Sequence, residues 1–420
     1  MWPFAAQFAG WPLRVAVGAG SLKNMVIGVP KESYPGERRV ALTPTVLPSL
    51  IQSGLTVLVE AGAGVAAGHA DEDFEKSGAE IIASRSEIFS AADIIVQVLA
   101  LNANPPAGSS DLALMRPHQA LIAFLRPLAT QDNKISALAK ARVTGFAVEL
   151  MPRITRAQSM DALSSMSTVV GYKAVLAAAE ALPKMFPMLM TAAGTIKPAR
   201  IFVIGAGIVG LQAIATARRL GAVVKAYDVR PAVRQEVESL GARFVEIALE
   251  TGEEEKAGGY AKPKDESFYR RQQELLTGAV AESDVVITAA VVPGRKAPVL
   301  ITETMVEQMA AGSVIVDLAA EQGGNCALSS AGENVDRHGV TIMSPINIAS
   351  TVPFHASQLY AKNLSTLLLY LIKDGELRLD GDDPIITGTL ITHDGEIVNE
   401  RIREFLQLPP LEAGAKKQEV

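Results

Sequence analysis

Three glycines stand at the spacing Gly-x-Gly-x-x-Gly, at positions 205, 207 and 210. They lie between an apolar segment, residues 201–204, that is typical of a buried strand, and a stretch that is typical of a helix. In this setting Gly205 permits a tight turn, Gly207 lets the backbone approach a pyrophosphate, and Gly210 lets helix and strand pack closely. The free N–H groups at the helix N-terminus then bind the phosphates. The predicted dinucleotide contacts are Gly205, Ala206, Gly207, Ile208, Val209 and Gly210.

An acidic residue ends the next predicted strand, residues 222–228. Asp228 lies 18 residues after Gly210, where a carboxylate can hold both hydroxyls of the adenosine ribose. Its negative charge repels the 2′-phosphate of NADP, so the sequence favours NAD(H). Val229 and Arg230 come directly after it and are included in the predicted site. Arg230 is interpreted as an adenine contact or as a surface charge.

Two further loops come after predicted strands of the same sheet. Residues 289–293 come after the strand at 284–288, and Ala290 is predicted to line the cofactor ribose. The run Gly323–Asn325 comes after the strand at 313–317, and Asn325 is predicted to contact the cofactor. Loops at the carboxyl ends of strands face the ligand crevice of an α/β sheet. Asp317 is expected either at that crevice or as a residue that only caps or turns the chain.

A polar, poorly periodic segment at 152–167 contains Arg153, Arg156, Gln158 and Asp161. Two cations and a carboxylate without helical pairing are costly to order unless they serve a ligand. One interpretation is a clamp on the nicotinamide, because an amide such as Gln158 offers an acceptor and donors to a carboxamide. The other is a solvated hinge whose charges pair with each other. The residues alone leave both open.

The segment 250–268 breaks the alternating pattern. It combines the acidic run GEEEK with the string AGGYAK, which contains Gly259 and Tyr260. An insertion longer than an ordinary connection, with charge, glycines and one aromatic, suggests a mobile functional loop. A disordered surface insertion explains the same composition. Both interpretations stay open on chemistry alone.

Strands and helices alternate from Met25 onward, which predicts an α/β fold. We expect two Rossmann-like, doubly wound parallel-sheet domains, separated by a cleft and joined by long helices at 169–186 and 353–372. The first domain is predicted at 25–162 plus 353–410, and the nucleotide-binding domain at 163–352. Residues 1–24 are predicted to be an extension outside the fold (an upstream start or a partner-binding tail), and 411–420 a flexible tail.

Composition narrows the functional classes. The net charge is −6, which argues against nucleic acid as the main partner, and a single cysteine, Cys326, excludes a disulfide within the chain and favours a reducing compartment. No run of 18 apolar residues occurs. None of the five histidines stands in a metal-ligand spacing, so no metal site is predicted.

Several long strings together resemble the NAD(H)-binding domain I, the alpha subunit, of proton-translocating NAD(P) transhydrogenases in the alanine dehydrogenase/transhydrogenase superfamily. The likeness runs from about residue 25 to 406. The strings are RITRAQSMDALSSMS at 153–167, TAAGTIKPARIFVIGAGIVGLQAIATARRLGA at 191–222, AGGYAK at 257–262 and VIVDLAAEQGGNC at 314–326.

The resemblance implies roles for individual residues. Arg153, Gln158 and Asp161 match the loop that positions the nicotinamide and faces the NADP(H) domain, and Ser164 matches a nearby nicotinamide contact. Tyr260 matches the tyrosine of a mobile loop that closes over bound nucleotide. Asp228 matches the adenosine-ribose aspartate. The catalytic set that the resemblance implies is therefore Arg153, Gln158, Asp161, Ser164 and Tyr260.

The resemblance also implies a reaction and partners. Hydride passes directly between NADH on this chain and NADP⁺ on another subunit, so proximity and orientation replace a general base. The implied partners are a membrane-spanning second alpha subunit, a beta subunit that carries NADP(H), and a second copy of this chain. The implied location is cytoplasmic, at the inner face of the cytoplasmic membrane through those partners.

Alanine dehydrogenases of the same superfamily are the first alternative. They carry a catalytic lysine after one first-domain strand and a histidine after the next, and the matching stretches here, 94–99 and 123–127, contain neither. Only Arg39 matches the substrate-binding arginine of the superfamily. Amino-acid oxidation needs a base for the substrate proton, so this alternative is disfavoured. A non-catalytic NAD(H)-sensing module is the second alternative.

Overall fold

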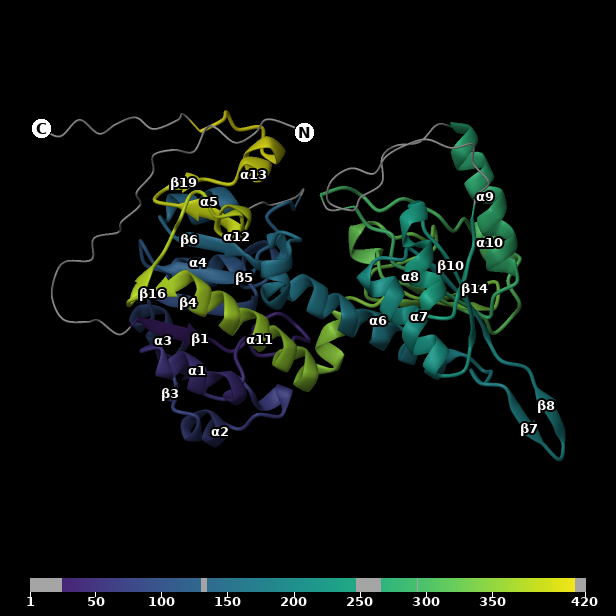
Figure 1. Ribbon diagram of the computed structural model, residues 1–420, viewed down its shortest axis with the longest axis horizontal. Helices are drawn as coiled ribbons and strands as arrows, with labels where there is room; N and C mark the ends of the chain where they lie inside the picture. The colour runs from purple at the N-terminus through teal and green to yellow at the C-terminus, as the bar shows by residue number, and fades with distance from the viewer. Residues whose placement is uncertain (1–24, 130–133, 247–265, 293, 412–420) are drawn as a thin grey trace, which may run out of the picture. The chain divides into compact units, whose positions relative to one another are not determined.

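The computed structural model describes residues 25–129, 134–246, 266–292 and 294–411. The described chain forms two compact units (Figure 1). One unit contains the residues up to Met166 together with those from Pro353 onward, and the other contains Ser167–Val352. Each unit is built on its own mostly parallel sheet, which confirms the predicted fold class of two parallel-sheet α/β units.

The first unit contains an eight-stranded sheet in the order β19-β18-β6-β5-β4-β1-β2-β3. The strands are β1 (Val26–Val29), β2 (Thr56–Glu60), β3 (Glu80–Ile82), β4 (Ile94–Leu99), β5 (Ala120–Phe124), β6 (Thr144–Ala147), β18 (Leu390–His393) and β19 (Glu396–Ile397). The first six are parallel, and β18 and β19 add an antiparallel edge from the C-terminal part of the chain. The parallel core therefore has the doubly wound order 3-2-1-4-5-6, with a switch point between β1 and β4.

Short helices connect these strands. They are η1 (Pro44–Val46), α1 (Leu47–Gln52), η2 (Val65–Ala67), α2 (Asp71–Lys76), α3 (Arg85–Ala91), η3 (Leu101–Ala103), α4 (Gly108–Leu114), α5 (Ile135–Lys140), η4 (Val148–Leu150), η5 (Thr155–Met160), α12 (Pro384–Thr389) and α13 (Glu400–Phe405). The long helix α11 (Pro353–Leu371) leads into the small hairpin of β16 (Ile372–Lys373) and β17 (Glu376–Leu377). Residues 44–52 are divided into η1 and α1, because Pro48 has no N–H to continue the first turn.

The second unit contains a seven-stranded sheet in the order β11-β10-β9-β12-β13-β15-β14. The strands are β9 (Arg200–Ile204), β10 (Val223–Tyr227), β11 (Arg243–Phe244), β12 (Val285–Thr288), β13 (Val314–Asp317), β14 (Asn334–Arg337) and β15 (Val340–Met343). All pair in parallel except β14. Counted along the chain, the parallel strands again have the order 3-2-1-4-5-6.

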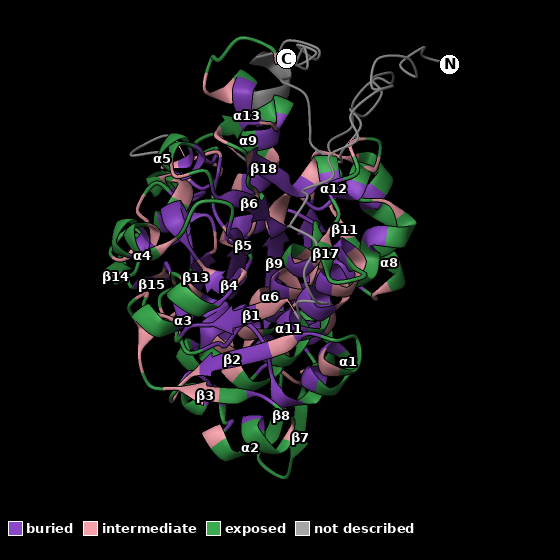
Figure 2. Ribbon diagram, turned by 90° about the vertical axis from the view of Figure 1, so that its left-hand side faces the viewer, coloured by how far each residue is buried: buried purple, intermediate pink, exposed green. Residues whose placement is uncertain are grey.

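Helices cover both faces of this second sheet. They are α7 (Ile208–Arg219), η6 (Pro231–Val233), α8 (Arg234–Ser239), α9 (Glu266–Ala281), α10 (Glu303–Glu307), η7 (Ala320–Gln322) and η8 (Ile348–Thr351). Successive residues of a strand point to opposite faces, so Ile201 and Val203 join one core cluster, and Phe202 and Ile204 join the other. Figure 2 shows the strands as mostly buried, as expected for sheets covered on both sides. The exposed hairpin of β7 (Leu189–Thr191) and β8 (Gly194–Ile196) precedes β9.

Helix α6 (Ala162–Ala181) contributes residues to both units. The sequence predicted this helix at 169–186, after a loop at 152–167, and both bounds were wrong. The helix begins earlier because Asp161 accepts a hydrogen bond from the backbone N–H of Ser164 and so caps its first turn. By length and hydropathy α6 would suffice to cross a membrane, which is also true of many core helices. Its Ala174, Val175 and Ala178 are buried in the core of the second unit.

Candidate functional site

The glycine turn occupies the position that the sequence predicted, between β9 and α7. Gly205 has φ of +96°, a left-handed conformation that favours glycine, and its N–H donates to the carbonyl of Tyr227. Gly207 is the N-cap of α7, and Ile208 begins the helix. The N-terminus of a twelve-residue helix therefore lies at the carboxyl end of the first strand of the second sheet. This is the arrangement in which helix N–H groups receive an anion.

Steric surroundings separate the tasks of the three glycines. A Cβ on Gly205 would lie 3.0 Å from the backbone carbon of Ala289, and a Cβ on Gly210 would lie 1.8 Å from the carbonyl oxygen of Gly205. Nothing lies within 4 Å of a Cβ placed on Gly207. Two of the glycines are therefore required by packing of the chain on itself. Gly207 faces open space, so a ligand can approach the backbone there.

Asp228 follows β10 and is tied to the turn by its side chain. Its Oδ2 accepts the N–H of Ala206 at 2.8 Å, and Arg230 donates to it from its backbone N–H, Nε and Nη2 at 2.9–3.0 Å. The Asp228 side chain is 7% exposed and that of Arg230 18% exposed. These four bonds fill the acceptor positions of a carboxylate. Asp228 can therefore accept a hydrogen bond from another group, such as a ribose hydroxyl, only if one of its bonds to the Arg230 guanidinium breaks.

In this structure Arg230 is the bidentate ion-pair partner of Asp228, two residues before it, because its side chain folds back along the chain. Its contact with the adenine stays a prediction. Val229, between them, packs against the core cluster on the α9 face of the sheet. The side chains of Val229 and Arg230 are therefore occupied by the protein itself in this structure.

Asn325 and Asp317 organise the loop after β13. The Asn325 side chain donates to the carbonyls of Ala290 and Pro298 and accepts the N–H of Ala290, all at 2.8–3.0 Å. Asp317 is fully buried and accepts five hydrogen bonds, among them the backbone N–H groups of Asn325 and Cys326. Asn325 is itself fully buried. Asn325 therefore holds Ala290 in place, and its contact with the cofactor stays a prediction. Asp317 has the turn-forming role that was the second interpretation from the sequence.

Part of the segment predicted as a loop is the 3₁₀-helix η5, which contains Gln158, while Arg153 precedes it and Asp161 directly follows it. Side chains three residues apart share a face of a 3₁₀-helix, and the buried row here consists of Ala157 and Met160. Gln158 is exposed on another row, and Arg153 is exposed before the helix begins. The charges of this segment therefore do not pair only with one another, as the hinge interpretation supposed: Arg156 donates to Asp383 of the C-terminal segment at 2.8 Å.

Asp161 and Ser164 contact each other at the start of α6. Asp161 Oδ1 accepts the backbone N–H of Ser164 at 2.9 Å, and the Ser164 hydroxyl donates to Asp161 Oδ2. Both residues are half-buried. The pair caps a twenty-residue helix that begins two residues after the end of η5, so Asp161 joins the two helices. Gly259 and Tyr260 lie outside the described residues.

Two buried carboxyl groups at the carboxyl edge of the first sheet were missed by the sequence reasoning. Glu32 follows β1 and accepts the backbone N–H groups of Val98 and Leu99, and its burial, with Glu37 second, raises its pKa to about 8. Glu149 in η4 accepts the N–H groups of Leu125 and Arg126, and burial raises its pKa to about 7. Buried glutamates with raised pKa values are candidates for function. Their signal, an acidic residue soon after a strand, was present but not used.

Arg39 lies in the same unit, 4% exposed, with a bidentate ion pair to Glu37. The side chain of Gln97 on β4 is buried and donates to Asp111, and Leu125 after β5 is fully buried. These are the strand ends where alanine dehydrogenases are expected to carry lysine and histidine. Here residues 94–99 offer the amide of Gln97, and residues 123–127 offer apolar groups and Arg126, with no lysine or histidine in either stretch.

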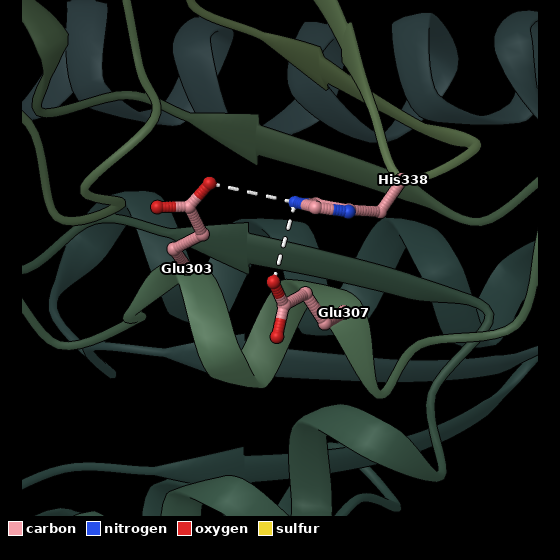
Figure 3. Close-up of side chains that lie close together, drawn as sticks. All are labelled: Glu303, Glu307 and His338. Atoms are coloured by element: carbon pink, nitrogen blue, oxygen red, sulfur yellow. Dashed lines mark hydrogen bonds and ion pairs between the residues drawn. The ribbon is translucent and has the colours of Figure 1, made fainter.

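One group of possible metal ligands occurs among the described residues (Figure 3). His338 Nε2 lies 3.5 Å from a carboxylate oxygen of Glu303 and 3.7 Å from one of Glu307. Sequence spacing could not reveal this group, because the histidine belongs to the turn between β14 and β15 and the glutamates to α10. All three side chains are exposed, as in an ordinary surface ion pair.

The second sheet thus carries a dinucleotide-type site, and the first carries a second doubly wound frame without a glycine turn. Together they define a two-domain, NAD-type dehydrogenase-like α/β protein. Residues 28–170 match the family "Alanine dehydrogenase/PNT, N-terminal domain", and residues 174–400 match "Alanine dehydrogenase/PNT, C-terminal domain". The chain belongs to the alanine dehydrogenase/PNT family.

Within this family, the chain is more similar in sequence to transhydrogenases than to the alanine dehydrogenase compared below. The chain is 46% identical over 380 residues to the first part of the NAD(P) transhydrogenase subunit alpha of Rhodospirillum rubrum, and the match covers 89% of this chain and 98% of that protein. A solved transhydrogenase from Sinorhizobium meliloti has a TM-score of 0.76 and 40% identity, covering 90% of this chain and 99% of that one. A solved L-alanine dehydrogenase has a similar TM-score, 0.74, but 27% identity, covering 91% and 99%. Both solved structures share the fold of this chain to a similar degree. The sequence identity is higher to the transhydrogenase than to the alanine dehydrogenase, as the resemblance implied.

Proposed function

We propose that this chain is the NAD(H)-binding subunit of a proton-translocating NAD(P) transhydrogenase. It would hold NADH and pass hydride to NADP⁺ on a partner subunit, with membrane subunits coupling the transfer to proton movement. The observation that carries the nucleotide part is the open space at Gly207, at the N-terminus of α7, beside Asp228. The higher identity to transhydrogenase alpha subunits than to alanine dehydrogenase supports the reaction.

Asp228 accounts for the choice of NAD(H) in this proposal. A carboxylate at this point repels a 2′-phosphate and accepts the ribose hydroxyls after the Arg230 side chain moves aside. The released guanidinium is then available to the adenine. Gly205, Ala206, Gly207, Ile208, Val209 and Gly210 would supply the phosphate-binding turn, with Ala290 beside the ribose.

Gln158 is proposed to orient the nicotinamide, with Arg153, Asp161 and Ser164 completing the catalytic segment. The exposed amide of Gln158 can bind a carboxamide. Direct hydride transfer needs no general base, so it requires no lysine or histidine at the strand ends of the first sheet. Gly259 and Tyr260 belong to the proposed cofactor site by resemblance alone. Orientation of the two nicotinamides would then supply most of the rate.

The test is Gln158→Asn, which keeps the amide and shortens its reach. Mixed with an NADP(H)-binding transhydrogenase subunit, the variant is expected to reduce thio-NADP⁺ at least about tenfold more slowly in stopped flow, because a misplacement of about 1 Å can cost 10²-fold. NADH affinity should change little. Ser159→Ala, at the neighbouring exposed position of η5, is the matched control. Equal rates for Gln158→Asn and wild type would contradict the assignment.

The proposed partners are a membrane-spanning second alpha subunit, a beta subunit that carries NADP(H), and a second copy of this chain. The proposed location is the cytoplasmic side of the membrane through those partners. The name of the Rhodospirillum relative, which makes it one part of an alpha subunit, supports a multi-subunit assembly. Light scattering of the purified chain tests the homodimer, and co-purification with membrane subunits tests the complex.

One observation favours a second candidate, an amino-acid dehydrogenase. Buried Arg39 and the glutamates Glu32 and Glu149 lie in the unit that alanine dehydrogenases use for substrate, and the raised pKa of each glutamate suits a general base. Reduction of NAD⁺ by L-alanine with the purified chain alone would establish this candidate. NADH binding without hydride transfer to an added NADP(H)-binding subunit would favour the NAD(H)-sensing module.

A further inference from the structure

A three-residue network binds η5 to the C-terminal part of the first unit. Arg156, in η5, donates from Nη2 to Asp383 Oδ1 at 2.8 Å and from Nη1 to the hydroxyl of Tyr370 at 3.3 Å. The Tyr370 hydroxyl in turn donates to Asp383 Oδ2. Each member therefore contacts the other two. The network closes a ring between segments more than 200 residues apart in sequence.

Asp383 is a fixed point in this ring. It is the N-cap of α12, where its Oδ1 also accepts the N–H of Ile385 at 2.8 Å, and Pro384 fixes the first helical position. Its side chain is 15% exposed. Burial, and then the bond to Asp383, raise the pKa of Tyr370, so the phenol keeps its proton and donates. Arg156 thus meets an acceptor whose position is set by a helix end.

A second bond holds the same segment. Asn363 Nδ2 donates to the carbonyl of Ser159 at 2.9 Å, and Asn363 is 7% exposed. Asn363 and Tyr370 are seven residues apart on α11, so they lie on one face of that helix. Gln158 lies between the two anchored residues, Arg156 and Ser159. A six-residue 3₁₀-helix has weak internal hydrogen bonds, so its exact placement depends on such outside contacts.

We propose that Arg156, held by Asp383 and Tyr370, is a positioning residue that fixes η5 so that Gln158 orients the nicotinamide for hydride transfer. This inference rests on the proposed function. The ion pair contributes little to stability, because Arg156 is 51% exposed and solvent screens it. Its effect is therefore on the orientation of a neighbouring side chain, and loss of the pair changes a rate more than a melting temperature.

Two substitutions each weaken the network with little other disturbance. Asp383→Asn keeps the N-cap, since asparagine caps as well as aspartate, and removes the charge that binds Arg156. Tyr370→Phe keeps the ring and removes the hydroxyl. The matched control is Arg378→Gln, which breaks the nearby exposed ion pair with Asp374 in the same C-terminal segment. That pair joins two residues four positions apart in the β16–β17 hairpin region and does not involve η5, so its loss should leave η5 in place.

Two readouts test the inference. With an added NADP(H)-binding transhydrogenase subunit, Asp383→Asn and Tyr370→Phe should each lower the single-turnover rate about 3- to 10-fold, with NADH affinity within about twofold of wild type. In the chain alone, the fluorescence anisotropy of bound NADH should fall in both variants and not in Arg378→Gln. Arg156→Lys, which keeps a charge, should restore part of the rate that Arg156→Gln loses.

The outcomes separate this inference from the proposed function. The inference is wrong if both variants have the rate and the anisotropy of wild type. It is also wrong if NADH affinity and melting temperature fall in proportion to the rate, because that result indicates a merely structural role. If the wild type transfers no hydride at all, the proposed function fails. The anisotropy of bound NADH then still decides whether the network orders the nicotinamide end.

Discussion

The two sheets share the strand order 3-2-1-4-5-6 but differ in the loop after the first strand. In the second unit β9 runs into Gly205, and α7 starts after Gly207. In the first unit β1 is succeeded by residues 30–43 without a helix, and the carboxyl group of Glu32 binds the backbone N–H groups of Val98 and Leu99 at the end of β4. At the glycine turn Asp228 accepts the N–H of Ala206, and the space beside Gly207 stays open. At the other switch point the carboxyl group of Glu32 accepts both N–H groups at the end of β4.

The strand order therefore produces a switch point in each sheet, and the loop after the first strand of the sheet determines whether a ligand can bind there. A glycine turn brings a helix N-terminus to the sheet edge and leaves space there, as at Gly207. A glutamate at the same topological position occupies the backbone donors and is itself buried. Substitutions at the two switch points should accordingly range from loss of folding at the glycine turn to a change of pH dependence at the glutamate.

Gly210→Ala should have the largest effect. The new methyl group would lie 1.8 Å from the carbonyl oxygen of Gly205, so α7 must move away from β9. The gain in helix propensity is about 1 kcal/mol, and the clash outweighs it, with a net loss of about 3 kcal/mol or more in the free energy of unfolding. Thermal unfolding measures this. An unchanged melting temperature would show that the turn is not packed as described.

Gly207→Ala should separate folding from binding at the same turn. Its methyl group meets nothing within 4 Å, so the melting temperature should stay near that of wild type. NADH binding should weaken about 10- to 100-fold, because the pyrophosphate loses close hydrogen bonds to the backbone. Isothermal titration with NADH checks this. An NADH affinity equal to that of wild type would show that the pyrophosphate does not bind at this turn.

Asp228→Asn should weaken NADH binding about tenfold and narrow the preference for NADH over NADPH. The amide keeps the shape but loses the charge that repels a 2′-phosphate, and Arg230 loses its ion-pair partner. Parallel titrations with NADH and NADPH give the ratio of affinities. A ratio equal to that of wild type would argue that Asp228 serves only Arg230 and Ala206.

Glu32→Gln should have the smallest effect, on the pH dependence of stability in the first unit. The folded pKa of about 8 lies above the ordinary value of 4.5, so folding holds a proton that the unfolded chain has released. This stability is present below pH 4.5 and is lost as the pH rises toward 8. The variant mimics the protonated form, so its melting temperature should fall less between pH 5 and 9, by about 3 °C. Glu87→Gln, an exposed control on α3, should keep the wild-type slope.

Local spacing and composition predicted the fold class and the glycine turn correctly, because Gly205–Gly210 and the strands around it act through near neighbours in the chain. Side-chain partners were predicted less well. The sequence did not predict that Arg230 binds Asp228 or that Asn325 holds Ala290, and the predicted cofactor contacts of both residues stay predictions. A sequence states which groups are polar but not which acceptor comes within hydrogen-bonding distance of each.

The position of the dinucleotide-type turn was determined by the sequence alone, since the need for Gly205 and Gly210 arises from backbone sterics within one strand–turn–helix unit. The tertiary structure was needed to decide that Gly207 faces open space and that Glu32 is bonded to the end of β4. It also decided that Arg156 reaches Asp383, more than 200 residues away. The physical reason is that sterics act between neighbours along the chain, whereas burial and hydrogen-bond pairing depend on segments that only folding brings together.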